Sequence, residues 1–375
     1  MLSARIESIG SSKLQLELPA LTGVRGLAAW WVVIYHFREN LHLANWPLTA
    51  AIIDQGNLAV DLFFVLSGFI IGMNYIGSLQ PFSIRPYFRF LILRLGRIYP
   101  LHLFMMVVFL VNPLTIIVFS HAQAPGVRYD AAYFGMSLLL VQNWGFTESL
   151  AWNVPAWSIS TEWFAYLIFP AIVWIGHLAT NKRRAVFGIA LCLTLLAVAV
   201  VVMQDDIPVN GLARCVLEFT SGTLVYVLWR QPSAHAARFA ELATILWLPL
   251  FAGVFFLPMS GYPIAAMAWC VLIFGLANNR PLLSRCFSTS LIYRIGEYSY
   301  STYLAHYFVR DWIKFLLIGR HLDWRIETAA YLAATAAASF VLYNLIEVPG
   351  RNYVRRRVNQ SRLTPRPSLP GGTRS

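Results

Sequence analysis

Long apolar segments separated by short polar or basic loops recur along this chain, from about residue 20 to residue 346. Each of these segments approaches the roughly 20 residues that an α-helix needs to cross the hydrocarbon core of a bilayer. The apolar residues form continuous runs rather than alternating with polar ones, which indicates helices. The pattern therefore predicts an all-α protein, a polytopic transmembrane helical bundle.

We expect about ten spans, with both termini in the cytosol. The predicted spans cover residues 20–39, 57–76, 98–119, 157–178, 185–203, 212–229, 242–258, 263–278, 296–317 and 326–346. The segment 120–156 has one apolar patch, residues 131–142, that is short for a crossing, so we predict an outer loop with a half-helix. With this count the basic loops, including the one that carries Arg85 to Arg97, all lie on the cytosolic side, as the positive-inside rule expects.

The two ends of the chain differ in composition from the spans. Residues 1–19 are polar and are predicted to be a cytosolic lead-in to a transmembrane domain at residues 20–350. Residues 351–375 are basic and rich in Pro, Gly, Ser and Arg, so we predict a disordered cytosolic tail.

Composition agrees with a membrane protein and argues against a nucleic-acid-binding one. Hydrophobic residues make up 58% of the chain and charged residues 12%, and the charged share is about half that of soluble domains. The net charge of +12 lies mainly in the loops and the tail, where membrane topology requires it. Of the 29 basic residues only Lys13, Lys182 and Lys314 are lysines, and the bias towards arginine hints at a ligand with phosphate or carboxylate groups.

The four cysteines indicate neither a metal site nor a redox site. Cys192, Cys215, Cys270 and Cys286 are scattered in or beside apolar segments, without the spacing of metal ligands. We interpret them as packing residues and expect no metal.

The first span carries two ionisable residues, Arg25 and His36. They are eleven positions apart, which is three helical turns plus about 20°, so they share one helix face. An ionisable residue in a span suggests a functional site. The alternatives are an arginine that snorkels to the headgroups and a histidine bonded to a nearby carbonyl. Their position on one face favours a working site.

Depth along the helices predicts two polar layers. Arg25, Arg94 and Arg97 lie near the cytosolic mouth, where arginines could hold the phosphates of a donor. His36 is roughly 22 Å further out in a core of about 30 Å, and Glu162, about 8 Å below the outer surface, reaches a similar depth. A neutral His36 could remove a proton from an acceptor hydroxyl, while Glu162 fixes its tautomer.

A tryptophan-rich run, WGFTESLAWNVPAWSISTEW, covers the end of the outer loop and the start of the next predicted span. Tryptophans at a membrane boundary ordinarily form an aromatic belt. The functional alternative is a platform on which sugar rings stack, with Trp144, Trp152 and Trp157 as candidates.

Three further residues have more than one reading. Asp61 could support His36, pair with an arginine or contact the acceptor, and the sequence does not choose. His306 could be a second polar contact in the pore or make a structural hydrogen bond. Ser67, beside Gly68, is more consistent with close helix packing than with a nucleophile, because no base is visible beside it in the sequence.

Six blocks together resemble the acyltransferase-3 family of integral membrane acyltransferases. They are Arg25-x10-His36, FFVLSGF at 63–69, RLGRIYP at 94–100, WSISTEWFAYLIFP at 157–170, GEYSYSTYLAH at 296–306 and IEVP at 346–349. Each block is weak alone, but six in this order are specific and cover the hydrophobic region. Leu95 departs from the family, since many relatives have a second arginine at that position.

The resemblance implies transfer of an acyl group, commonly acetyl, from cytosolic acyl-CoA to a hydroxyl of a cell-surface polysaccharide or its lipid-linked precursor. It implies His36 as the catalytic residue, Arg25, Arg94 and Arg97 in donor binding or site architecture, and Glu162 as the family's acidic residue. The chain resembles the stand-alone exopolysaccharide and O-antigen O-acetyltransferases, which implies a place in the inner membrane. The expected partners are the bilayer, acetyl-CoA and the sugar acceptor.

Two other functions remain open on sequence grounds. A proton-coupled transporter could use His36, Glu162 and Asp61 as a relay, but it would be expected to contain internal repeats, and none is obvious between the two halves. An acyltransferase could also act on a small hydroxylated metabolite, such as an antibiotic sugar. Within acyl transfer we favour direct base catalysis over an acyl-enzyme intermediate.

Overall fold

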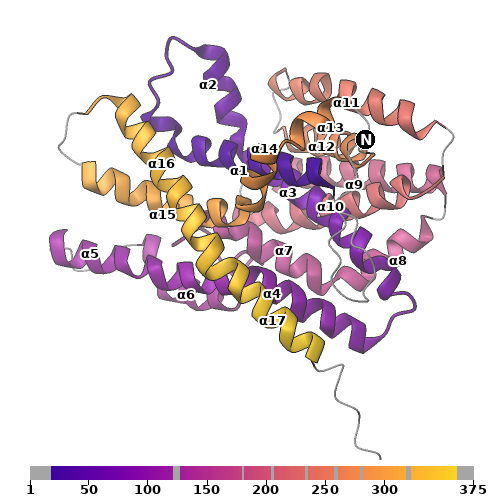
Figure 1. Ribbon diagram of the computed structural model, residues 1–375, viewed down its shortest axis with the longest axis horizontal. Coiled ribbons are helices and arrows are strands. Elements are labelled where there is room, and N and C mark those ends of the chain that lie inside the picture. Colours follow the sequence, from indigo (N-terminus) through magenta and orange to yellow (C-terminus); the bar gives the residue numbers. More distant parts are fainter. Residues whose placement is uncertain are drawn as a thin grey trace, which may run out of the picture.

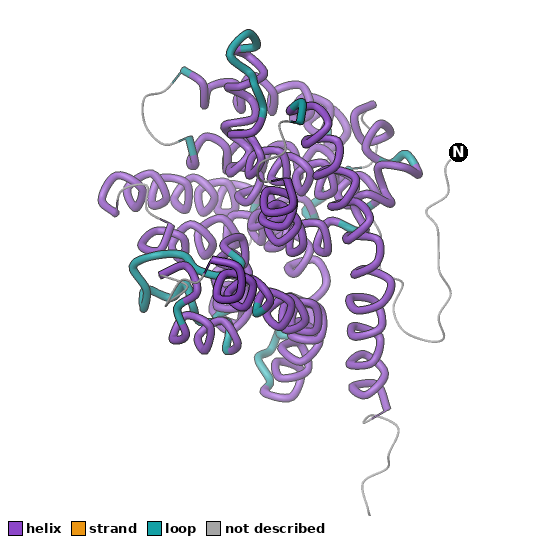
Figure 2. Tube along the Cα trace, turned by 90° about the vertical axis from the view of Figure 1, so that its left-hand side faces the viewer, coloured by secondary structure: helices purple, strands orange, loops and turns teal. Residues whose placement is uncertain are grey.

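The computed structural model describes residues 18–120, 127–179, 181–203, 207–232, 235–256, 261–278, 282–317 and 322–360. Within these ranges the regular structure is entirely helical, which confirms the all-α prediction (Figure 1). Short turns and loops connect the helices (Figure 2).

The helices, in chain order, are α1 (Pro19–Phe37), α2 (Pro47–Asp54), α3 (Ala59–Tyr75), α4 (Ile84–Phe109), α5 (Val111–Ser120), α6 (Ala131–Leu138), α7 (Trp157–Leu167), α8 (Phe169–Leu178), α9 (Lys182–Met203), α10 (Ile207–Trp229), α11 (Ala236–Ala252), α12 (Tyr262–Ala277), α13 (Leu282–Phe287), α14 (Ser290–Glu297), α15 (Ser299–Leu317), α16 (Trp324–Leu342) and α17 (Val348–Gln360). Three short turns used below are η1 (Arg38–Asn40), η4 (Val127–Tyr129) and the π-helical η7 (Tyr343–Glu347).

Six helical segments in the described ranges are long and apolar enough to cross a membrane, and a bent pair could make a seventh. The six are Pro47–Ser78, Ile84–Phe119, Lys182–Met203, Ile207–Trp229, Ala236–Phe255 and Trp324–Gln360, and the bent pair is Val154–Leu167 with Phe169–Leu178. The chain is therefore a multi-pass helical membrane protein. The count of ten spans and the cytosolic position of both termini stay predictions.

Two helices outside that set, α1 and α15, carry ionisable residues within apolar stretches. Arg25 and His36 interrupt α1, and Arg310, Asp311 and Lys314 interrupt α15. Both helices pack against one another (Figure 1), and α1 also packs on α3 and α14. Their polar side chains therefore face protein, which is where ionisable groups in a membrane protein are tolerated.

Helices α3 and α10 form the tightest contact of the bundle. A Cβ atom added to Gly68 would lie 1.9 Å from the carbonyl oxygen of Phe219, and one added to Gly222 would lie 1.9 Å from that of Val65. Only glycine allows two helix backbones to approach this closely, as small residues do in many membrane helix pairs. The prediction that the Ser67-Gly68 pair allows close helix packing is thus confirmed for Gly68.

Two predicted boundaries differ from the structure. Helix α4 begins at Ile84, so Arg85, Arg89, Arg94 and Arg97 lie on a helix and not in a loop. The predicted span 157–178 is bent by 62° between α7 and α8. Pro170 stands in the first turn of α8, where its missing N–H costs nothing but a straight continuation of α7 is disfavoured.

Residues 351–360, which the sequence assigns to a disordered tail, are helical. Helix α17 continues α16 through η7 and packs along α4 (Figure 1). Val354 lies against Gly96, Gly350 lies against Pro100, and Arg89 donates to Asn359 at 3.0 Å. These tertiary contacts stabilise a segment whose composition alone favours disorder. Residues 1–17 and 361–375, the lead-in and the end of the tail, lie outside the described residues.

Candidate active site

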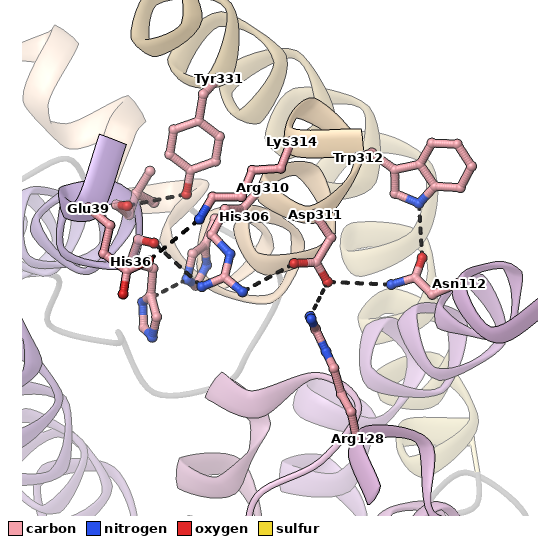
Figure 3. Close-up of polar contacts among 11 residues, drawn as sticks. His36, Glu39, Asn112, Arg128, His306, Arg310, Asp311, Trp312, Lys314 and Tyr331 are labelled. Atoms are coloured by element: carbon pink, nitrogen blue, oxygen red, sulfur yellow. Dashed lines mark hydrogen bonds and ion pairs between the residues drawn. The ribbon is translucent and has the colours of Figure 1, made fainter. Parts of the chain in front are cut away.

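Two imidazoles meet inside the bundle. His36, near the end of α1, and His306, on α15, bring Nδ1 and Nε2 respectively to 3.2 Å from each other, with ring centroids 5.0 Å apart (Figure 3). The rings of Tyr35 and Tyr307 stand edge-on to His36 at 5.0 and 5.5 Å. His306 is fully buried, whereas His36 is only partly buried and so remains accessible.

The backbone fixes which nitrogen of His36 carries the proton. Its Nδ1 lies 3.0 Å from the carbonyl oxygen of Val32, one turn back along α1. A carbonyl oxygen can only accept, so Nδ1 carries the hydrogen and Nε2 carries the lone pair. Among the described residues Nε2 has no hydrogen-bond partner. A neutral, partly accessible imidazole with a free lone pair can act as a base.

Glu162 does not contact His36 in the described part of the chain. Its carboxylate accepts hydrogen bonds from Ser67 on α3 and from Tyr166 on its own helix, the latter at 2.6 Å. The expectation that Glu162 orients His36 therefore finds no contact to support it. Similar depth does not bring two residues together when their helices differ in position around the bundle. Helix α7 packs on α10 and α4, whereas α1 packs on α14, α15 and α3.

The three arginines of the cytosolic layer differ in how they are partnered. Arg25 donates to the carbonyl oxygen of Gly296 at 3.0 Å, and Arg94 donates to the hydroxyl of Tyr75 at 2.9 Å. Neither has an ion-pair partner among the described residues, and the Nε atom of each is buried without a partner. Neither guanidinium is thus directly paired with a carboxylate in the described part of the chain, and such a group can bind an anion through its planar fork.

Arg97, by contrast, is neutralised. It forms an ion pair with Glu347 of η7, which is 1% exposed and also accepts from Ser301 of α15 at 2.7 Å. This arrangement ties α4, α15 and η7 together. Of the two roles that the family resemblance allows Arg97, it favours site architecture.

Asp61 pairs with Arg214, one of the three alternatives that the sequence left open. The two side chains are 3.0 Å apart and are 0% and 1% exposed. The guanidinium of Arg214 also lies over the ring of Tyr262, 3.5 Å from its centroid. Through this buried pair Asp61 is a structural ion-pair partner of Arg214.

Two of the three candidate stacking tryptophans are buried. Trp152 and Trp157 are each 5% exposed. Trp152 donates from its indole to Asp130 at 2.7 Å, and Trp157 packs against Phe64 and Arg214. Their rings are covered by protein, so they leave no face for a sugar. Trp144 is partly exposed and donates to the carbonyl oxygen of Ser160 at 3.0 Å, and its role as a platform stays a prediction.

A polar network that the sequence did not single out lies next to His36, towards the end of α1 (Figure 3). Arg310 donates to the backbone oxygen of His36 at 3.5 Å and to Asp311 at 3.1 Å, and its guanidinium stacks on Tyr307 at 3.8 Å. Asp311 also pairs with Arg128 of η4. The network joins α1, α15 and η4 and lies beside the imidazole pair.

A small cavity of about 160 Å³ lies beside this network, between the ends of α1, α15 and α16. Its lining includes Phe37, which follows His36, together with the polar side chains of Asn40, Lys314 and Glu327. It is large enough for a few hydroxyl-sized groups.

Four residues of these polar networks were not predicted from the sequence, although the sequence contains a signal for them. Arg214 and Glu218 on α10, and Arg310 and Asp311 on α15, are ionisable residues in predicted spans, as His36 is. The same rule that drew attention to the first span applies to them. Their pairing is visible only in the structure.

Together these features define a class of protein: a multi-pass helical membrane protein that holds a pair of imidazoles inside its helix bundle. It also has two arginines, Arg25 and Arg94, that form no ion pair among the described residues. Residues 18–344 match the family described as "Acyltransferase domain". The match spans nearly the whole chain, so the chain belongs to this family, the acyltransferase-3 family of integral membrane acyltransferases, and the resemblance drawn from the six blocks is confirmed.

Named relatives are similar over most of the chain. "Acyltransferase MdmB" of Streptomyces mycarofaciens is 27% identical, over 91% of this chain and 94% of its own length. "Peptidoglycan O-acetyltransferase OatA" of Listeria monocytogenes is 25% identical over 89% of this chain and 56% of its own. "Putative peptidoglycan O-acetyltransferase YrhL" of Bacillus subtilis is 25% identical over 77% and 48%. No solved structure matches the chain.

The chain thus spans nearly all of MdmB but about half of the two peptidoglycan enzymes. Family and relatives together establish a membrane acyltransferase of a family that contains O-acetyltransferases.

Proposed function

We propose that the protein transfers an acetyl group from cytosolic acetyl-CoA to a hydroxyl of a cell-surface polysaccharide or its lipid-linked precursor, in the inner membrane. The observation that carries this proposal is the state of His36. Its Nδ1 is committed to Val32, its Nε2 is free, and the ring is held inside the bundle next to a polar network. This is the arrangement of a general base.

The arginines support a donor that carries phosphates. A guanidinium that is partly removed from water without a counter-ion is costly, and a phosphate offers two oxygens to its planar fork. Arg25 and Arg94 are such groups among the described residues. We therefore assign these two, and not Arg97, to phosphate binding.

The reaction step follows from the free lone pair. The acceptor O–H gives its proton to Nε2 of His36 as its oxygen bonds to the acyl carbon of the thioester. The C–S bond then breaks, and the leaving thiolate takes the proton from Nε2, which returns the ring to its neutral form. In the transient imidazolium, Nδ1–H keeps its bond to the carbonyl oxygen of Val32.

Two alternatives remain to be weighed against this proposal. Membership of an acyltransferase family favours group transfer over a proton-coupled transporter. A small hydroxylated metabolite is a second acceptor class. The names of two relatives refer to peptidoglycan, which favours a polymeric glycan.

The direct test uses membranes with labelled acetyl-CoA and compares His36→Ala with wild type. We expect His36→Ala to insert normally and to lose transfer by about 10²- to 10⁴-fold, the usual contribution of a general base. His177→Ala is the matched control, because His177 is an exposed histidine of α8, and it should transfer at the wild-type rate. Transfer by His36→Ala near the wild-type rate would remove His36 from the mechanism.

The same assay separates the alternatives. Label in acid-precipitable glycan supports a polysaccharide acceptor, and label in a small soluble product supports a metabolite. Solute uptake that depends on the protein, without labelled product, would mean a transporter. Mass spectrometry of the host's surface glycan, with and without the gene, then identifies the acetylated sugar.

A further inference from the structure

His306 occupies the place where histidine bases commonly have a carboxylate. We propose that His306 is a positioning residue that holds His36 in the tautomer and ring orientation needed for base catalysis. This inference rests on the proposed function of His36 and adds a second residue to it. The sequence suggested only a polar pore contact or a structural hydrogen bond for His306.

The direction of the hydrogen bond between the two rings follows from the backbone. Nδ1 of His306 lies 3.3 Å from the carbonyl oxygen of Thr302, one turn back along α15. Because that oxygen only accepts, Nδ1 of His306 carries the hydrogen, and its Nε2 offers a lone pair. This lone pair lies 3.2 Å from Nδ1 of His36, which is the protonated nitrogen of that ring. The single hydrogen on Nδ1 of His36 is therefore shared between the carbonyl oxygen of Val32 and Nε2 of His306, so His36 donates a bifurcated hydrogen bond and His306 accepts part of it.

The carbonyl of Val32 alone holds the ring weakly. In an α-helix the same oxygen already accepts the backbone N–H of His36. A second acceptor on a neighbouring helix favours the Nδ1–H tautomer more strongly and restricts rotation of the ring. It also stabilises the imidazolium that forms when Nε2 takes a proton. A neutral acceptor does this without placing a further charge in the low-dielectric interior.

Among the groups around His36, His306 is the one that can hold its tautomer and stabilise its imidazolium. The charges that act on His36 are those of Arg310 on α15 and Arg38 of η1, both positive. Both oppose an imidazolium. Among the described residues no carboxylate contacts the ring, and Glu162 is occupied by Ser67 and Tyr166. An uncharged acceptor is thus the partner that the structure supplies.

Close helix packing keeps the two rings in contact. A Cβ on Gly26 of α1 would lie 2.5 Å from the backbone nitrogen of Gly296, and one on Gly296 would lie 2.0 Å from the oxygen of Thr22. At the other end of α1, Tyr331 of α16 donates to the carbonyl of Val33 at 3.2 Å and stacks on Phe37. Helix α1 is therefore held at both ends, on α14 and on α16, and it also packs directly on α15, the helix that carries His306.

The test compares two substitutions at position 306. His306→Leu keeps bulk but removes the acceptor, and His306→Gln restores an acceptor oxygen at a similar distance from the backbone. We expect His306→Leu to lower kcat by about tenfold to hundredfold, by analogy with the loss of a residue that orients a metal-bound imidazole. The donor KM should stay at its wild-type value. His306→Gln should recover most of kcat.

A second readout does not depend on activity. The ¹⁵N shifts of His36, identified among the eight histidines by their loss in His36→Gln, report its tautomer in lipid nanodiscs. We expect the Nδ1–H form in the wild type and in His306→Gln, and a mixture of forms in His306→Leu. The pH at which kcat is half-maximal should differ from the wild-type value in His306→Leu but not in His306→Gln.

The outcomes separate this inference from the proposed function. If His36→Ala abolishes transfer while His306→Leu keeps the wild-type kcat, pH profile and ¹⁵N shifts, His306 has no positioning role. If His306→Leu and His306→Gln lose kcat equally, and only in proportion to the folded fraction, its role is structural and the inference fails. If His36→Ala keeps activity, the proposed function fails, while the ¹⁵N shifts still decide whether His306 sets the tautomer.

Discussion

The buried charges between α3 and α10 lead to a stability prediction that can be worked out from the charge count. Asp61 and Arg214 form an ion pair at 3.0 Å with essentially no exposure. Glu218, one turn further along α10, is also fully buried and interacts with both. With all three groups charged there would be one positive and two negative charges, so a substitution at each position changes the balance differently.

The expected magnitudes follow from that balance. Two unit charges about 4 Å apart interact by about 4 kcal/mol at an effective dielectric constant near 20. Removing one member of a buried pair costs about 3–5 kcal/mol. Arg214→Met removes the only cation and should cost this full amount. Asp61→Asn leaves Glu218 as a counter-ion and should cost about 1–3 kcal/mol. Glu218→Gln leaves the ion pair intact and should change stability by less than about 1 kcal/mol.

The measurement is reversible unfolding in mixed micelles with increasing SDS, followed by the fluorescence of the chain's 13 tryptophans. We expect the free energy of unfolding to fall in the order Glu218→Gln, Asp61→Asn, Arg214→Met. The reasoning is refuted if Arg214→Met unfolds with the wild type, or if Asp61→Asn is the most costly change. Transfer activity per folded molecule should be unchanged in Asp61→Asn, because Asp61 is buried against Arg214 and takes no part in the proposed transfer step.

Two further predictions concern donor binding and helix packing. Arg94→Ala should raise the donor KM with kcat unchanged, because it removes a ground-state phosphate contact, whereas Arg97→Ala should lower the folded yield, because Glu347 loses its cation. Steady-state kinetics check the first expectation and gel filtration the second. The double variant Arg97→Ala with Glu347→Gln should fold normally. If Arg97→Ala alone folds normally and only raises the donor KM, Arg97 binds the donor and is not structural. Gly222→Ala should destabilise by about 1–3 kcal/mol, because its Cβ would clash with the carbonyl of Val65. The same unfolding assay applies, with Gly135→Ala on α6 as the control, since a Cβ there meets nothing within 4 Å; equal effects of the two would contradict the packing argument.

The helical membrane class could be predicted from the sequence because hydrophobicity over about 20 residues is a local property. The starts and ends of helices were less predictable. The basic segment from Arg85 to Arg97 and the basic segment after Gly350 read as a loop and a tail, yet they are helices that pack on each other. Their stability comes from a contact between residues more than 250 positions apart, such as Arg89 with Asn359, which no local pattern records.

The sequence by itself singled out Arg25 and His36 as candidate site residues, because ionisable side chains in an apolar helix indicate a functional site. Only the tertiary structure decided their partners. Depth follows from the rise per residue and is the same in any bundle, so the sequence alone could predict His36 and Glu162 at a similar level. Position around the bundle depends on how whole helix surfaces pack, and that packing brought His306 to His36 and Glu162 to Ser67.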